Sequence, residues 1–557
     1  MKETFDQFDN NQNYCISQEM RNQLRLDPKI GAGNFIFYAY KINPLPAVPI
    51  LYLDSKFHAI NGENYNHLSL DEIYKLVHLY ATWYLTCGIQ KKTPVAIFMN
   101  DGIGYLIHFM ALTSIGAIPA LINSHMNCEI AVKFINKIAA ELVIVDSDHY
   151  LPMKTLFSSH GYNILIININ TITDIILIDP NFHPYVHEDD DPIMITHSSG
   201  TTGMPKAICL QHSGFFYGIR YLLSLPAMEG IERLLSSLPS SHNSAIAYSM
   251  YALLSGVQLM ISSQRVGFEV LKLIEKFKPS TIVSFPETYV QMLEQDLNKY
   301  DLSSISYWIN SGDAAHERHI KALVKYGYHY RGLQKIQGSQ FVDGLGSSEM
   351  GHTLFRIIHT STTNTFERCI GSPQPWVSAV VLDQNGKQLS FGKIGWLGVK
   401  GPSITSGYWN ESVLTHRSKS GSYWLTGDVV YQDDKGLFYH LDRIQDVIYT
   451  LQGPLYSIWA EELIMRAIDE IFDCSIVATN INNNITPAIF VLMAKGYSMT
   501  EKEILIRCNS ILSQYEMPLL SVVYIVENVP RGITGKVLKR LLRDNLSNKV
   551  VNYVTSN

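Results

Sequence analysis

The chain has 557 residues, more than one hydrophobic core usually supports, and its 46% of hydrophobic residues can build cores for two or more domains. Its 44 lysines and arginines are balanced by 50 aspartates and glutamates, a formal net charge of -6. This balance excludes the basic excess of a nucleic-acid-binding protein and the cationic surface of a peripheral membrane protein.

The ends of the chain and its cysteines bear on where the protein works. The first ten residues lack the basic and apolar regions of a secretory signal, and the last residues carry no prenylation, retention or peroxisomal motif. The seven cysteines lie far apart, without a CxxC pair or a Cys/His metal spacing, which predicts reduced thiols. We therefore expect a cytoplasmic protein.

The first part of the chain predicts alternating helices and strands. Ser69 and Glu72 form a capping box that opens an amphipathic helix, and Gly88 ends it. The most apolar stretch, residues 105–122, is interrupted by polar residues and by Pro119, so a helix followed by a strand fits it better than a membrane-spanning helix. Strands are predicted at 95–99, near 118 and at 142–146, and helices through Met110 and at 128–139. This alternation predicts right-handed βαβ units on a parallel sheet, with no integral membrane association.

The same alternation returns after Thr196, which predicts a second α/β layer. Strands are expected at 258–262, 281–285 and 307–311, and helices at 268–277, near Val290 and from His316. From 370 to 440 the pattern changes to short apolar runs separated by Gly, Pro, Asn and Asp, which predicts a mostly β region. Beyond Arg443 a shorter α/β segment is expected, with strands at 489–493 and 522–526 and helices from Thr500 and after Lys536. We expect a domain boundary near Asp442.

The loop THSSGTTGMPK, Thr196 to Lys206, has two interpretations. It is either a surface loop without a chemical role or a cradle in which backbone N–H groups, hydroxyls and a lysine surround phosphate oxygens. It is not a Walker A loop, which requires GxxxxGK[ST]. Three further motifs follow in order: DGLGSSEMG (Asp343–Gly351), LTGDVV (Leu425–Val430) and VPRGITGKVLKR (Val529–Arg540).

With these four ordered motifs, the chain resembles the AMP-forming adenylating superfamily of acyl- and aryl-CoA synthetases, peptide-synthetase adenylation domains and luciferases. The resemblance extends from Ser69 to Arg540, and DGLGSSEMGH is most similar to the benzoate-type CoA ligases. It implies an α/β fold in which the large N-terminal domain, 1–442, holds two α/β layered subdomains and a small β-barrel-like subdomain at about 370–440. A smaller, mobile C-terminal α/β domain, 443–557, acts as a lid.

The resemblance also implies a nucleotide site. Asp428 is matched to the residue that accepts both ribose hydroxyls, a task that suits the two oxygens of an ionised carboxylate, and Arg443 also reaches the ribose. Leu345 stands where many members have a tyrosine against adenine, so apolar packing replaces aromatic stacking. The residues that we expect to bind ATP are Thr196, Ser198, Ser199, Gly200, Thr201, Thr202, Gly203, Lys206, Gly312, Asp343, Gly344, Leu345, Gly346, Ser348, Asp428 and Arg443.

Three residues are matched to catalytic positions. Glu349 is expected to bind Mg²⁺, because a hard cation that bridges phosphates prefers a carboxylate oxygen. Lys536 is expected to neutralise the substrate carboxylate and the α-phosphate in the transition state. His242 is expected to line the acyl tunnel. Each has a simpler alternative: a solvated loop glutamate, a solvated lysine at a helix start and a satisfied core histidine.

The hinge segment departs from the family pattern. Asp442 replaces the usual glycine, Gln445 stands at the hinge, and residues 451–462 keep Gly453 but lose the expected proline. In the family this segment rotates toward the active site and shapes the thiol tunnel once the adenylate has formed.

Two classes of function follow. The first is a carboxylic acid:CoA ligase that uses ATP and Mg²⁺ to adenylate a small-molecule carboxylic acid and transfers the acyl group to coenzyme A, or to the phosphopantetheine of a carrier protein as a possible partner. The second is a catalytically impaired nucleotide-binding or interaction protein. Lys206, Glu349, Asp428 and Lys536 are all present, which favours the enzyme.

Overall fold

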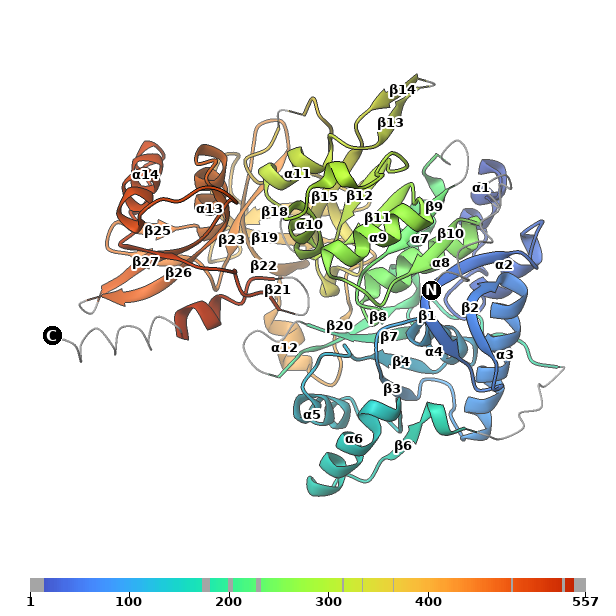
Figure 1. Cartoon of the computed structure of the whole chain (residues 1–557). Coiled ribbons are helices and arrows are strands. Elements are labelled where there is room, and N and C mark those ends of the chain that lie inside the picture. Colours follow the sequence, from blue (N-terminus) through green and yellow to red (C-terminus); the bar gives the residue numbers. More distant parts are fainter. Residues whose placement is uncertain are drawn as a thin grey trace.

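The computed structural model describes residues 15–172, 181–198, 204–226, 232–312, 315–332, 334–363, 365–481, 484–532 and 536–544. Helices α1 (Gln18–Leu26) and α2 (Phe35–Ile42) lie at one end of the molecule, and the C-terminal elements α13 (Ser457–Ala467) and α14 (Glu501–Gln514) lie at the other (Figure 1). Among the described residues, no helix has the length and apolar character needed to cross a membrane. None of the seven cysteines, all of which are described, forms a disulfide bond in the structure.

The first predicted α/β layer is a sheet with the strand order β20-β8-β7-β4-β3-β5-β6. Its central strands are parallel, as the sequence predicts, and β7, β8 and β20 pair antiparallel at one edge. The capping box at Ser69 and Glu72 opens α3 as expected. The elements are α3 (Leu70–Thr86), β3 (Pro94–Phe98), α4 (Gly104–Ser114), β4 (Ile118–Leu121), α5 (Cys128–Lys137), β5 (Leu142–Val145), α6 (Ser147–Ser159), β6 (Leu165–Asn168), η1 (Ile169–Thr171), β7 (Pro192–His197), β8 (Ala207–Gln211) and β20 (Gly407–Tyr408).

The second predicted layer contains a parallel block in the order β15-β12-β11-β9-β10-β1, with β2 beside β1. The sequence did not predict β1, which pairs with β10 about two hundred residues later, because no local pattern encodes so distant a partner. The elements are β1 (Pro49–His58), β2 (Asn64–Ser69), α7 (His212–Ser224), β9 (Arg233–Ser236), α8 (Asn243–Ser255), β10 (Gln258–Ile261), α9 (Gly267–Phe277), β11 (Thr281–Ser284), α10 (Pro286–Leu293), η2 (Leu297–Lys299), β12 (Tyr307–Asn310), α11 (Glu317–Leu323) and β15 (Gln340–Gly346).

The region from 370 to 440 is mostly β, as predicted. Its strands are antiparallel and continue the second sheet through β16 and β17, in the order β18-β19-β22-β23-β17-β16-β15. The elements from η3 to the end of this region are η3 (Ser348–Met350), β16 (Thr353–His359), β17 (Cys369–Pro373), β18 (Ser378–Leu382), β19 (Gly395–Lys400), α12 (Ser412–Arg417), β21 (Lys419–Ser420), β22 (Tyr423–Gln432) and β23 (Phe438–Arg443).

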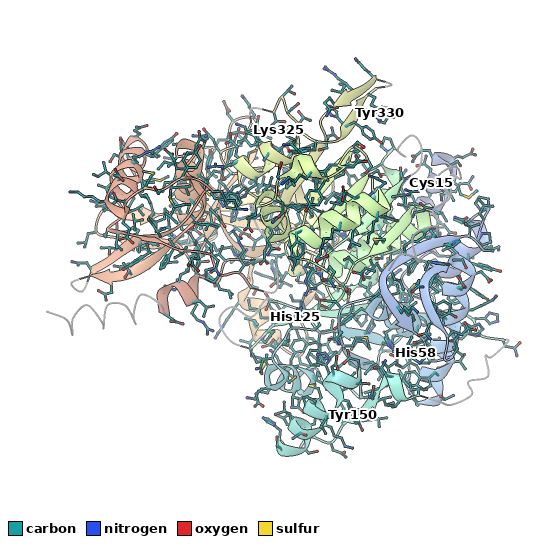
Figure 2. All side chains as sticks on the ribbon, in the orientation of Figure 1. Cys15, His58, His125, Tyr150, Lys325 and Tyr330 are labelled. Carbon is teal, nitrogen blue, oxygen red and sulfur yellow. The ribbon has the colours of Figure 1, made fainter. Side chains whose placement is uncertain are left out.

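A hairpin that the sequence did not predict projects from the body of the molecule. It consists of β13 (Tyr328–Arg331) and β14 (Gln334–Gln337), which form a separate two-stranded sheet (Figure 1). Figure 2 shows the Tyr330 side chain on this hairpin, at the edge of the molecule. The Lys335 ammonium lies 3.8 Å from the centre of the Tyr328 ring.

The C-terminal elements form a smaller α/β unit with its own sheet, β26-β27-β28, and its own core around Ile464, Ile489 and Ile504. The chain thus has a large N-terminal and a smaller C-terminal part, as predicted; the position of the boundary at Asp442 stays a prediction. The elements are β24 (Ile448–Thr450), β25 (Gly453–Leu455), α13, β26 (Ile471–Ile481), β27 (Asn484–Met493), α14 and β28 (Val522–Ile525), followed by a helical segment at 539–544.

Candidate active site

One cavity of about 340 Å³ lies where the two parts of the chain meet. The ends of β7, β12 and β15, the start of α8, and strands β22 and β23 contribute its wall, and the C-terminal part adds residues from α13 and from the segment after Arg531. The sequence-predicted residues that line the cavity are Thr196, Ser198, Lys206, His242, Gly312, Asp343, Gly344, Leu345, Gly346, Ser348, Glu349, Asp428, Arg443 and Lys536. The fold therefore brings together residues that are up to 340 positions apart in the sequence.

The predicted phosphate loop begins and ends at this cavity. Ser198 follows β7, and Lys206 precedes β8; the Ser198 N–H donates to the Lys206 carbonyl at 3.2 Å, and the Lys206 N–H donates to Ser198 Oγ at 3.0 Å. These bonds close the neck of the loop. The loop residues Ser199, Gly200, Thr201, Thr202 and Gly203 lie outside the described residues.

Glu349 and Lys206 meet at a tyrosine that the sequence analysis missed. The Tyr408 hydroxyl donates to Glu349 Oε1 at 3.1 Å and lies 3.4 Å from Lys206 Nζ. Burial and the Glu349 charge together raise the pKa of Tyr408 well above its usual range, so the hydroxyl keeps its proton. No spacing signals this contact, because Tyr408 and Glu349 are 59 residues apart.

Asp428 lies against an arginine and a histidine of the neighbouring strand β23. Arg443 Nη1 lies 2.7 Å and His440 Nε2 3.1 Å from Asp428 Oδ1. Burial would raise the pKa of this fully buried carboxyl, but the Arg443 charge and the hydrogen bonds from both partners outweigh it and hold the pKa well below its usual range. The other oxygen, Oδ2, has no hydrogen-bond partner among the described residues.

The predicted adenine-contacting turns come from β12 and β15. Asn310 Nδ2 and the Gly344 N–H donate to Asp343 Oδ1 at 2.8 and 2.9 Å, which fixes the Asp343 carboxylate at the cavity wall. A Cβ on Gly344 would lie 1.9 Å from the Phe355 carbonyl oxygen, so only glycine allows β15 and β16 to approach this closely. Gly312, two residues after the end of β12, has φ +108°.

His242 is a neutral histidine with a defined tautomer. It caps α8, and its Nδ1 accepts from the Ser244 N–H at 3.2 Å, which leaves the proton on Nε2. Burial, with a smaller contribution from His197 and Lys536, lowers the pKa of His242 to about 4. His197 is likewise neutral because burial lowers its pKa, and its Nε2 accepts from the Asn123 N–H at 3.0 Å. His242 can therefore offer an N–H donor, but no charge, to a bound oxygen.

Lys536 enters the cavity from the C-terminal part. The Gly532 N–H donates to the Lys536 carbonyl at 2.8 Å, and residues 531 and 537 form an antiparallel bridge, so the backbone at Lys536 is paired with the chain at residues 531–532. The ammonium contributes to the electrostatic environment of His242 on the opposite part of the chain.

Asp442, which replaces the family's glycine, is fully buried beside the hinge. Its Oδ2 accepts from the Ser457 N–H at 2.5 Å and from Ser457 Oγ at 2.8 Å. Burial raises its pKa, although the Lys539 charge and the bonds from Ser457 oppose this shift. Neither the contact nor the helix α13 that carries Ser457 was predicted from the sequence.

Comparisons with known proteins fit this geometry. Residues 54–409 match the AMP-binding enzyme family. A 3-aminoavenalumate diazotase from a Streptomyces species is 36% identical over 95% of this chain and 98% of that protein. A long-chain-fatty-acid–CoA ligase from Bacillus subtilis strain 168 is 27% identical over 64% of this chain and 62% of that protein.

Among solved structures, an anthranilate CoA ligase in complex with anthranoyl-AMP has the same fold, with a TM-score of 0.80. It is 18% identical, and the alignment covers 96% of this chain and 100% of that chain. Taken with the match over most of the large N-terminal part, these findings establish that the chain belongs to the AMP-binding enzyme family of adenylating proteins.

Proposed function

We propose that this protein activates a small acid with ATP, forms a mixed anhydride with AMP and transfers the activated group to an acceptor. The observation that carries the proposal is that Lys206, Glu349, Asp428 and Lys536 line a single cavity. Adenylation needs a cation for the leaving phosphates, a carboxylate for a metal ion, a carboxylate for the ribose and a second cation at the α-phosphate.

The residues fit a nucleotide. Asp428 Oδ2 is a buried acceptor without a donor among the described residues, and a ribose hydroxyl would supply that donor. The loop from Thr196 to Lys206 would hold the phosphates, and Gly312 with residues 343–346 would contact adenine.

The residues also fit Mg²⁺. Glu349 offers one carboxylate beside the Tyr408 hydroxyl, and the described residues contain no cluster of three or more potential metal-binding side chains. An ion held by one carboxylate that takes its other ligands from phosphates and water matches the preference of Mg²⁺. When bound, the ion would neutralise charge on the departing pyrophosphate.

The chain's own groups would act mainly through position and charge. Lys536 would neutralise the attacking acid and the α-phosphate together, and the neutral His242 would donate a hydrogen bond to the acid without repelling Lys536. No side chain needs to form a covalent bond with the substrate, so alignment and charge neutralisation carry the catalysis.

One candidate acceptor is the thiol of coenzyme A or of a carrier protein, which would make the protein a carboxylic acid:CoA ligase. In that reaction a carboxylate oxygen attacks the α-phosphorus, pyrophosphate leaves, and the thiol then displaces AMP. A CoA ligase with 27% identity supports this candidate.

The other candidate acceptor is an aromatic amine, as in a diazotase. An oxygen of nitrite would attack the α-phosphorus and release pyrophosphate, and the amine nitrogen would then attack the nitrosyl nitrogen and release AMP. Uptake of one proton and loss of water from the N-nitrosamine would leave the diazonium group, with no external oxidant. We rank this candidate first, because the diazotase is 36% identical over nearly the whole of both chains.

A two-arm assay separates the candidates. The protein is incubated with ATP and Mg²⁺, and either with nitrite and an aromatic amine (3-aminoavenalumate or 3-aminobenzoate) or with coenzyme A and a panel of aromatic and fatty acids. We expect an azo dye after coupling of the first arm with a naphthylamine, in excess of the dye formed without ATP. A CoA thioester in the second arm, with no ATP-dependent dye in the first, would establish the ligase instead.

A further inference from the structure

We propose that the C-terminal part of this protein stays docked during both half-reactions, so that the acceptor is a small molecule that reaches the adenylate within the cavity and not a pantetheine thiol that enters after domain rotation. This inference rests on the proposed adenylating function. It is carried by buried contacts on both sides of the hinge at Gln445.

The first contact spans the hinge itself. Asp442 lies before Gln445, at the end of β23, and Ser457 lies after it, at the start of α13. Both side chains are fully buried, and the Asp442 carboxylate accepts two hydrogen bonds from Ser457. A glycine at position 442 could make neither bond. Rotation about Gln445 would separate the two residues and leave a buried carboxylate without its donors, which is costly.

The second contact fixes the segment that carries Lys536 to the same helix. Lys539 Nζ donates to Ser457 Oγ at 2.5 Å and lies 3.3 Å from Glu461 Oε1, which also accepts from the Ile476 N–H at 2.6 Å. The Lys539 and Glu461 side chains are 12% and 6% exposed. Lys536 therefore moves only if α13 moves with it.

The third contact joins α13 to the large N-terminal part. Glu462 lies 2.8 Å from His316 Nδ1, accepts from the Glu317 N–H at 3.1 Å and lies 3.8 Å from Arg368 Nη1. Burial would raise the pKa of Glu462, but the bond and charge of His316 and the charge of Arg368 lower it to about 2. Opening the junction would break a buried ion cluster, and separated buried charges are strongly unfavourable until water reaches them.

An arginine makes a fourth contact between the large N-terminal part and the C-terminal part. Arg318, on α11, donates to the carbonyl oxygens of Asp469 and Ile471 at 2.5 Å each, just beyond α13. These contacts use backbone acceptors next to the end of α13, so they form only while that end lies against α11. The docked state is thus held at the hinge, along α13 and after its end, with Lys536 in the cavity.

A cross-link across the junction tests the inference. Lys495 Nζ donates to the Glu294 carbonyl oxygen at 2.7 Å across it, and both residues are exposed and outside the cavity lining, so Glu294→Cys with Lys495→Cys can be joined by a short bismaleimide. ATP–pyrophosphate exchange reports the first half-reaction. Multiple-turnover AMP release with nitrite and 3-aminobenzoate reports the complete reaction, and the same measurement with coenzyme A and benzoate is expected to show no turnover. Each single variant and the wild type, treated with the same reagent, control for the natural cysteines.

We expect the cross-linked protein to keep both activities within about twofold of the untreated double variant, because no rotation is needed. The inference is overturned if exchange survives the cross-link while multiple turnover with the acceptor stops. Absence of exchange in the untreated wild type with any acid would instead contradict the proposed function, so the two failures are distinguishable.

Discussion

At the scale of single residues, the site is defined by polar atoms whose partners come from distant parts of the chain. Motifs identified Glu349, Asp428 and Lys536 because each lies in a short pattern of glycines and hydroxyl residues. Tyr408 and His440 could not be predicted, because their role depends on strand pairing that brings them to Glu349 and Asp428. A contact between residues far apart in the sequence leaves no local pattern.

Asp428→Asn tests the ribose assignment. The amide keeps the shape of the side chain but loses the charge that faces Arg443, and it places a donor where a ribose hydroxyl would need an acceptor. We expect the affinity for AMP, measured by calorimetry, to fall about tenfold to a hundredfold, the range of hydrogen bonds to charged groups. Asp434→Asn, in an exposed turn, is the matched control and should bind AMP like the wild type; equal affinity in the Asp428 variant would contradict the assignment.

His242 has two roles that substitution can separate. As the N-cap of α8 it accepts a backbone hydrogen bond, a role that asparagine can also fill, while its ring faces the cavity. We expect His242→Asn to unfold at the same temperature as the wild type and His242→Ala to unfold earlier. Both should lose pyrophosphate exchange, on the order of 10²-fold if a transition-state donor is removed. Full activity of the asparagine variant would leave His242 with the capping role alone.

At the scale of helices and strands, the sequence predicted those elements whose apolar residues recur at regular spacing. The helices at 70–86 and 267–277 and the strands at 94–98 and 281–284 lie within two residues of their predicted positions. The hairpin β13–β14 and the strand β1 were missed, because a short polar hairpin and a strand with a distant partner carry no clear period. Helix α13 was missed because its N-cap residue, Tyr456, makes no side-chain capping hydrogen bond, so no capping signal marks the start of the helix.

The pairing of His316 with Glu462 makes the junction between α11 and α13 sensitive to pH. Burial would lower the pKa of His316, but the bond and charge of Glu462 outweigh it and raise the pKa above its ordinary value. Because the pKa of His316 is higher in the folded than in the unfolded protein, its pairing with Glu462 contributes fully to the free energy of unfolding below the ordinary pKa of histidine. This contribution is lost as the pH rises through the pKa that His316 has in the folded protein. We therefore expect the thermal midpoint of the wild type to fall as the pH rises above about 6.5, the ordinary pKa of histidine.

His316→Asn isolates this effect. Asparagine can still donate to Glu462 but does not titrate, so the variant's thermal midpoint should depend less on pH over the same interval. The difference in free energy of unfolding between wild type and variant should be largest at the acidic end. An identical pH dependence in both proteins would contradict a charged His316 in the folded state.

At the scale of the whole molecule, the sequence predicted two large layers and a smaller C-terminal part, and the structure has them. What it could not predict is the relation between the parts. The cavity exists only where β22, β23, α8 and the C-terminal segment meet, and the buried contacts of Asp442, Lys539 and Glu462 hold them in that position. These contacts depend on how two folded units dock, which residue patterns do not encode.

The central claim is that this cavity adenylates an acid, and the most direct measurement is ATP–pyrophosphate exchange with Mg²⁺ across nitrite and a panel of aromatic and fatty acids. Lys536→Ala is compared with wild type and with Lys502→Ala, an exposed lysine on α14. We predict exchange with one class of acid, unchanged in Lys502→Ala and reduced on the order of 10²-fold or more in Lys536→Ala. ATP binding without exchange for any acid would contradict the account and favour a nucleotide-binding protein without turnover.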